Sequence, residues 1–168
     1  MNTFTLIKEN GARQEMPFFI EQIGGVYVEY VSQHITRREA EDPLTKSVVV
    51  TETNIEQFEE VRRILKSAIP VNALYRTMAY QEHLIKLGYK AAKKHPPHCT
   101  GDAMDMGLTK QYKIEDLIEA NKIASKRLNL PAPRLGFKEY NNTFLHRDHV
   151  YLLHGNPDPV NWAPGVCW

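Results

Sequence analysis

Two short segments constrain the fold of this 168-residue chain more than any other feature. Residues 98–105 read His-Cys-Thr-Gly-Asp-Ala-Met-Asp, and residues 144–148 read Phe-Leu-His-Arg-Asp. In the first segment Gly101 stands between a histidine and an aspartate, and it permits the turn that brings both side chains to one point. The second segment adds another histidine from a later, apolar part of the chain. The fold must therefore bring two separated segments together.

Three polar residues of these segments, His98, Asp105 and His146, form a ligand set that suits zinc. Three protein ligands leave a fourth position for water, as in hydrolytic rather than structural zinc sites. Ala103 is small enough to lie beneath such a site without filling it. Other histidines lack a comparable context, and we expect surface or core positions for His34, His83 and His154.

Composition excludes several classes of partner. The 21 basic and 20 acidic residues give a formal charge of +1, so no overall field attracts nucleic acid or a membrane surface. The basic stretch around residues 86–95 is expected to be a solvated face. No apolar run approaches the roughly 20 residues needed to span a bilayer. Two cysteines, Cys99 and Cys167, cannot form a disulfide framework, which favours a reducing compartment.

Residues 1–50 are expected to be a β-rich framework without chemistry of its own. Strands are predicted at residues 3–7, 26–31 and 47–51, where β-branched and aromatic residues gather between turn residues. We expect an irregular tail over residues 155–168.

Residues 53–150 are expected to form the core around the metal site. A helix should begin at Thr53, with Glu56 completing a capping box, and end at Pro70. A second helix should run from a Thr77 cap to about residue 87, where Gly88 stops it. The remaining predicted elements are a strand at 71–76, a strand at 102–107, a helix at 114–128 and a hairpin joining 135–137 to 143–146. The pattern predicts one α+β domain over residues 1–168.

The pattern His98-x-x-Gly101-x-Ala103-x-Asp105, followed by Phe144-Leu145-His146-x-Asp148, resembles the signature of the zinc D-Ala-D-Ala carboxypeptidase family. That family belongs to the lysostaphin, D-Ala-D-Ala peptidase and hedgehog fold group. The resemblance runs from about residue 71 to 148 and includes Tyr75-Arg76-Thr77 and Gly136-Phe137. It implies a small antiparallel sheet with flanking helices around a zinc site.

The resemblance also implies residue roles. His98, Asp105 and His146 would be the zinc ligands, and Arg76 would grip a carboxylate or carbonyl of the substrate. The implied activity is hydrolysis of a peptide bond in peptidoglycan stem peptides or cross-links, by a carboxypeptidase or an endolysin-like endopeptidase. The expected partner is thus a peptidoglycan peptide, and we expect a monomer. The N-terminus lacks a secretory signal pattern, which predicts synthesis in the cytoplasm and action at the cell wall after release or delivery.

The general base is less closely defined. Several family members carry an acidic residue three positions before the last histidine, where this chain has Thr143. Another branch has an aspartate two positions after that histidine, as Asp148 is. Asp148 would act either as the base or as an orienting partner of a zinc-bound histidine. Glu139 and His149 are the alternatives for the base.

Two other classes of function compete with a zinc peptidase. A non-catalytic zinc-containing binding or phage structural module could keep the same fold and ligands without turnover, and Thr143 at the acidic position favours that reading. A cysteine hydrolase would use Cys99 as its nucleophile, but the adjacent His98 is poorly placed to be its base.

Overall fold

A four-stranded antiparallel sheet, in the order β7-β8-β10-β9, organises the C-terminal part of the protein. The structure is a computed structural model and describes residues 2–89, 96–138 and 141–149. The strands span Val71–Ala73 (β7), Ala103–Gly107 (β8), Arg134–Gly136 (β9) and Phe144–Asp148 (β10). The predicted strand at 102–107 and the antiparallel pairing of the last two strands are confirmed.

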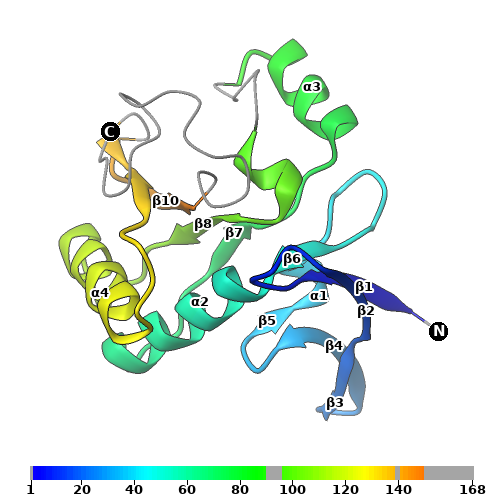
Figure 1. Cartoon of the computed structure of the whole chain (residues 1–168), viewed down its shortest axis with the longest axis horizontal. Helices are drawn as coiled ribbons and strands as arrows, with labels where there is room; N and C mark the ends of the chain where they lie inside the picture. The colour runs from blue at the N-terminus through cyan, green and yellow to red at the C-terminus, as the bar shows by residue number, and fades with distance from the viewer. Residues whose placement is uncertain (1, 90–95, 139–140, 150–168) are drawn as a thin grey trace.

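The two faces of this sheet differ in chemistry because successive side chains of a strand point to opposite sides. Met104, Met106 and Leu145 lie on one face and are fully buried. Asp105 and His146 lie on the other face. Helices α2, Glu52–Leu65, and α4, Ile114–Arg127, pack against each other and cover the apolar face (Figure 1). The sheet therefore presents its polar face to the candidate site.

A buried arginine ties the sheet to both helices. Arg147 of β10 is 0% exposed and donates to the backbone oxygen of Asn54 at 2.9 Å and to the side-chain oxygen of Asn121 at 3.3 Å. It also donates to the side-chain oxygen of Asn54. Burial lowers the pKa of Arg147 to about 10, although Asp102 and Asp148 oppose that shift, so the side chain stays charged. These bonds fix the position of β10 relative to α2 and α4.

Helix α2 does not begin or end where the sequence predicted. Its N-cap is Thr51, whose side-chain oxygen accepts from the backbone of Asn54 at 3.2 Å, whereas Thr53 lies inside the first turn. The helix ends at Leu65 because Lys66 adopts the left-handed conformation, with φ of 51°. Pro70 follows the helix but does not terminate it.

The other predicted helices are confirmed. Helix α3 spans Met78–Lys86, Thr77 caps it, and Gly88 follows with φ of +85°. The short helix α1, Arg37–Ala40, and the 3-10 turn η1, Pro97–Thr100, were not predicted. Within the described ranges, no helix combines the length and apolar character that a membrane crossing requires.

The N-terminal part forms two further small sheets. The first has the order β2-β1-β6 and the second β3-β4-β5. Three of these strands, β1, β4 and β6, match predicted strands, whereas β2, β3 and β5 were not predicted. Their bounds are Thr3–Ile7 (β1), Arg13–Pro17 (β2), Phe19–Ile23 (β3), Val26–Ser32 (β4), Ile35–Thr36 (β5) and Val49–Thr51 (β6). The described residues thus form an α+β fold of three small sheets and four α-helices, as the sequence predicted for the fold class.

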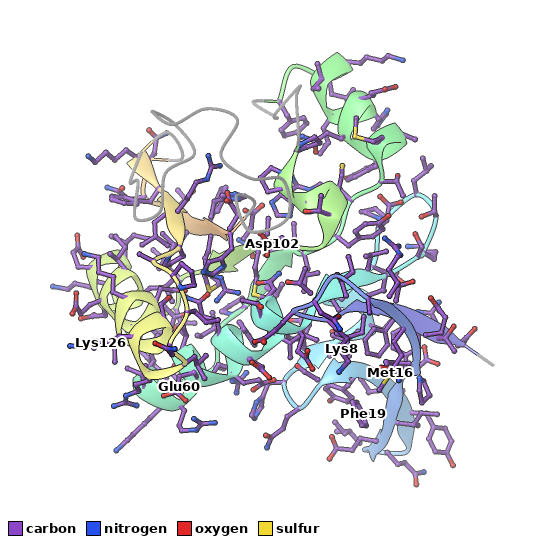
Figure 2. All side chains as sticks on the ribbon, in the orientation of Figure 1. Lys8, Met16, Phe19, Glu60, Asp102 and Lys126 are labelled. Atoms are coloured by element: carbon purple, nitrogen blue, oxygen red, sulfur yellow. The ribbon has the colours of Figure 1, made fainter. Side chains whose placement is uncertain are left out.

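The two N-terminal sheets differ in how far they enter the core. Phe4 of β1 and Val50 of β6 are buried, so the first sheet packs against the rest of the protein. The hairpin of β3 and β4 projects outward, and Phe19 and Tyr27 on it are 61% and 71% exposed. Figure 2 shows Phe19 on this outlying hairpin and Asp102 near the middle of the molecule. Val31 of β4 and Ile35 of β5 are nevertheless 2% and 0% exposed, so the second sheet also enters the core and only the outer end of its hairpin stays exposed.

Candidate metal centre

The structure brings three sequence-predicted ligands together. One ligand atom each from His98, Asp105 and His146 lies within 4.8 Å of the others, and all three residues are buried. Asp105 on β8 and His146 on β10 are direct partners in the antiparallel register, so both side chains leave the same face of the sheet side by side. His98 approaches from η1. Among the described residues, this is the only group of three or more His, Cys, Asp or Glu side chains close enough to share a metal ion.

Hydrogen bonds to the segment after β7 hold His98 in place. The Nδ1 atom of His98 lies 2.7 Å from the carbonyl oxygen of Leu74, which can only accept. The backbone N–H of Arg76 donates to the carbonyl oxygen of His98 at 3.2 Å. Because Nδ1 carries the proton toward Leu74, Nε2 is left with its lone pair on the side of Asp105.

Gly101 allows η1 to lie directly against β6. Its φ is +76°, and a Cβ added there would lie 2.5 Å from the carbonyl oxygen of Val49. The backbone N–H of Thr51 donates to the carbonyl oxygen of Gly101 at 3.1 Å, and Asn54 donates to the same oxygen at 3.1 Å. Gly101 therefore lies in a turn, as the sequence predicted, and at a point where β6 leaves no room for a Cβ atom.

The distances within the group fit a metal ion. Oδ1 of Asp105 lies 2.7 Å from Nδ1 of His146 and 3.2 Å from Nε2 of His98. Zinc bonds of 2.0–2.1 Å at tetrahedral angles place ligand atoms about 3.3 Å apart. The two imidazole rings meet edge to face, with centroids 5.0 Å apart. Small movements of these side chains would accommodate one ion among the three donor atoms.

Charge at the centre follows from burial and pairing. Burial raises the pKa of Asp105, but the neighbouring histidines, with His98 the larger contributor, outweigh it and hold the pKa well below its usual range. Burial lowers the pKa of His146, whereas hydrogen bonds to Asp105 and Asp148 raise it to about 9. Burial lowers the pKa of His98. The ionised carboxylate is therefore the group with affinity for a cation here.

Arg76 contacts the ligand carboxylate in this structure. Its terminal NH2 nitrogen donates to Oδ2 of Asp105 at 2.9 Å, while Oδ1 of Asp105 faces the two histidines. The Arg76 side chain keeps 20% of its surface exposed. Arg76 thus lies at the rim of the centre, and its predicted grip on a substrate stays a prediction.

Asp148 lies behind His146, at the nitrogen that faces away from Asp105. Its Oδ2 atom is 3.0 Å from Nε2 of His146. Arg134 on β9 donates to Asp148 through Nε at 2.8 Å and through NH2 at 2.9 Å. Arg134 was not predicted from the sequence, because it lies opposite Asp148 only through the register of β9 and β10. Asp148 thus lies where an orienting partner of His146 would lie, and whether it acts as that partner or as the base stays a prediction.

The other candidates for catalysis have less favourable surroundings. Glu139 lies outside the described residues. Burial, assisted by Arg147, lowers the pKa of His149 to about 3, which leaves a neutral, weakly basic imidazole at pH 7. Burial raises the pKa of Cys99 to about 11, so the reactive thiolate is scarce at neutral pH.

Fold and site together define an α+β protein with a buried His-Asp-His group that could hold a metal ion. No protein-family model, curated protein or solved structure matches this chain. The likeness to the zinc D-Ala-D-Ala carboxypeptidase family thus rests on the motif residues themselves.

Proposed function

We propose that the protein is a zinc-dependent hydrolase that cleaves a peptide bond in peptidoglycan stem peptides or cross-links, with a fold of the hedgehog and D-Ala-D-Ala peptidase type. The observation that carries this proposal is the convergence of His98, Asp105 and His146 within 4.8 Å, from two segments with residues 106–143 between them. These are the three ligand residues chosen from the sequence motif, and the fold places them together.

His98, Asp105 and His146 would hold the zinc through Nε2, Oδ1 and Nδ1 respectively. When bound at such a site, zinc activates water and polarises a carbonyl as a Lewis acid. The surrounding residues keep the donor atoms largely away from solvent, since the three side chains are only 5–8% exposed. In this poorly solvated environment, electrostatic interactions with a reacting peptide are stronger than in water.

Arg76 would orient the peptide beside the zinc ligands. Its planar guanidinium offers a fork of donors for a carboxylate, and one of its nitrogens already donates to Asp105. A substrate carboxylate at the exposed side of Arg76 would lie next to the ligand carboxylate. Substrate position would therefore depend on the same side chain that steadies Asp105.

The second candidate function is a zinc-containing module without turnover. Two observations favour it: position 143 carries threonine, and both oxygens of Asp148 are hydrogen-bonded to neighbouring side chains. This reading shares the zinc site with the peptidase and differs from it only in the absence of cleavage.

Incubating the zinc-loaded protein with purified peptidoglycan should release new peptide fragments, identified by mass spectrometry of the muropeptides. The masses name the bond, whether D-Ala-D-Ala, L-Ala-D-Glu or a cross-bridge. A chelator should abolish the release and added zinc should restore it, because the reaction needs the ion. Full zinc occupancy without any fragment would instead support the non-catalytic module.

Replacing Arg76 with lysine should lower kcat/KM about 10- to 100-fold, as expected for loss of a bidentate charged contact. Zinc affinity should change little, since a lysine ammonium can still pair with Asp105. Steady-state kinetics and a zinc titration measure the two effects separately. Arg127→Lys, on the surface of α4 and paired with Glu60, is the matched control. Unchanged kinetics in Arg76→Lys would exclude Arg76 as the substrate anchor.

A further inference from the structure

We infer that Arg134 is a positioning residue of the metal centre, which acts through Asp148 to determine the nitrogen that His146 offers to the ion. This inference rests on the metal binding in the proposed function, but it does not depend on cleavage. Arg134 was not among the residues singled out from the sequence.

The first step is the pairing of Arg134 with Asp148. The two residues are direct neighbours across β9 and β10, and their side chains are 8% and 0% exposed. Nε of Arg134 donates to Oδ1 of Asp148 at 2.8 Å and NH2 donates to Oδ2 at 2.9 Å. Two parallel bonds from a planar fork fix the plane of the carboxylate as well as its position. Asp148 is therefore held as an oriented, ionised acceptor.

The second step links Asp148 to His146. Oδ2 of Asp148 lies 3.0 Å from Nε2 of His146, and an ionised carboxylate can only accept a hydrogen bond. Nε2 of His146 must therefore carry a proton. Nδ1, on the other side of the ring, lies 2.7 Å from Asp105. When the ring gives up one proton to bind an ion, Asp148 keeps the proton on Nε2, and Nδ1 becomes the nitrogen with a free lone pair. A carboxylate behind a metal-bound histidine also makes the ring a stronger electron donor.

His98 provides an internal contrast. Its Nδ1–H group donates to the backbone carbonyl oxygen of Leu74 at 2.7 Å, so the ring presents Nε2 to the centre. The orientation of His98 thus comes from the main chain, whereas that of His146 comes from two side chains. Changing Arg134 should therefore alter the ring orientation of His146 and leave that of His98 unchanged. A general loss of stability would instead affect both rings.

The test measures metal affinity and ring state together. Wild type and Arg134→Met, both with ¹⁵N-labelled histidine, are titrated with zinc against a chelator of known affinity, and NMR reads the ring nitrogens of the zinc-loaded proteins. We expect Arg134→Met to bind zinc about 10- to 100-fold more weakly, the usual cost of losing an outer partner of a metal ligand. The Nε2–H signal of His146 should shift, while the Nδ1–H signal of His98 should not. Arg134→Lys should recover part of the affinity, because an ammonium restores the charge beside Asp148 but not the two-pronged contact.

Two further variants complete the test: one is a surface control, and the other replaces Arg134→Met if that protein does not fold. Arg127→Met removes an arginine from the surface of α4 and should leave both readouts unchanged. If Arg134→Met does not fold, the double variant Arg134→Met, Asp148→Asn removes both buried charges and keeps an oxygen acceptor behind His146. It should also show weakened zinc binding and a shifted His146 signal.

The inference is overturned if a folded Arg134 variant binds zinc as tightly as wild type with an unchanged His146 signal. It is also overturned, together with the proposed function, if wild type binds no zinc. Zinc binding that depends on Arg134, in a protein that cleaves no peptidoglycan, would overturn the proposed hydrolase and support this inference.

Discussion

Replacing His98 with alanine is expected to abolish zinc binding at physiological metal concentrations and to remove all peptidoglycan cleavage. The substitution deletes one of three donor atoms that lie within 4.8 Å of one another. Loss of a residue that merely supports a metal ligand costs about 10- to 100-fold in affinity, so loss of a ligand should cost more than about 100-fold. A zinc titration and the muropeptide assay measure the two consequences.

His83→Ala is the matched control for this experiment. His83 is an exposed histidine on α3, and it belongs to no group of potential ligands among the described residues. It should bind zinc and cleave as wild type does. Circular dichroism of His98→Ala separates metal loss from unfolding, because the variant also loses the bond from Nδ1 to Leu74. A folded His98→Ala protein that holds zinc tightly or remains fully active would end the proposal of a His-Asp-His zinc centre.

The second large effect is expected at Gly101, where alanine should destabilise the protein by roughly 2–5 kcal/mol. A left-handed backbone costs a non-glycine residue about 1–2 kcal/mol, and overpacking a core adds about 1–3 kcal/mol. The new Cβ would lie 2.5 Å from the carbonyl oxygen of Val49 and 2.8 Å from Cα of Val50. Both are main-chain atoms of β6, so no flexible side chain can move aside. Chemical denaturation measures the free energy of unfolding.

Gly11→Ala isolates the backbone contribution to that loss. Gly11 has a similar φ of +80°, but nothing lies within 4 Å of its added Cβ. We expect it to lose only about 1–2 kcal/mol, from the left-handed backbone. Gly101→Ala should also weaken zinc binding, because displacement of η1 from β6 moves His98. Equal losses in the two variants would show that the approach of Gly101 to Val49 has no energetic importance.

Local patterns accounted for most of the regular structure. The run of β-branched and aromatic residues at positions 3–7 predicted β1. The Thr77 cap and Gly88 predicted the limits of α3, because caps and turns act within a few residues of the chain. The predicted start of α2 was wrong because two threonines, Thr51 and Thr53, could both cap it. Only the extended backbone of Thr51 at the end of β6 places its oxygen against the first turn.

The short strand β2 was not predicted for a related reason. Residues 13–17 contain three charged or polar side chains, one methionine and one proline, and all five of these residues are at least partly exposed. They form a strand because they pair with β1 in register, an interaction that no local pattern encodes.

What the sequence determined by itself is the set of donors: two histidines and an aspartate, with a glycine where the turn must be tight. Residue chemistry and spacing suffice for that, since they limit which ions the side chains can hold. The tertiary structure decided which nitrogen each histidine presents, that Arg76 pairs with Asp105, and that Arg134 lies behind Asp148. Those facts depend on strand register and on contacts between residues far apart in the chain, and a one-residue shift of register would send each side chain to the opposite face.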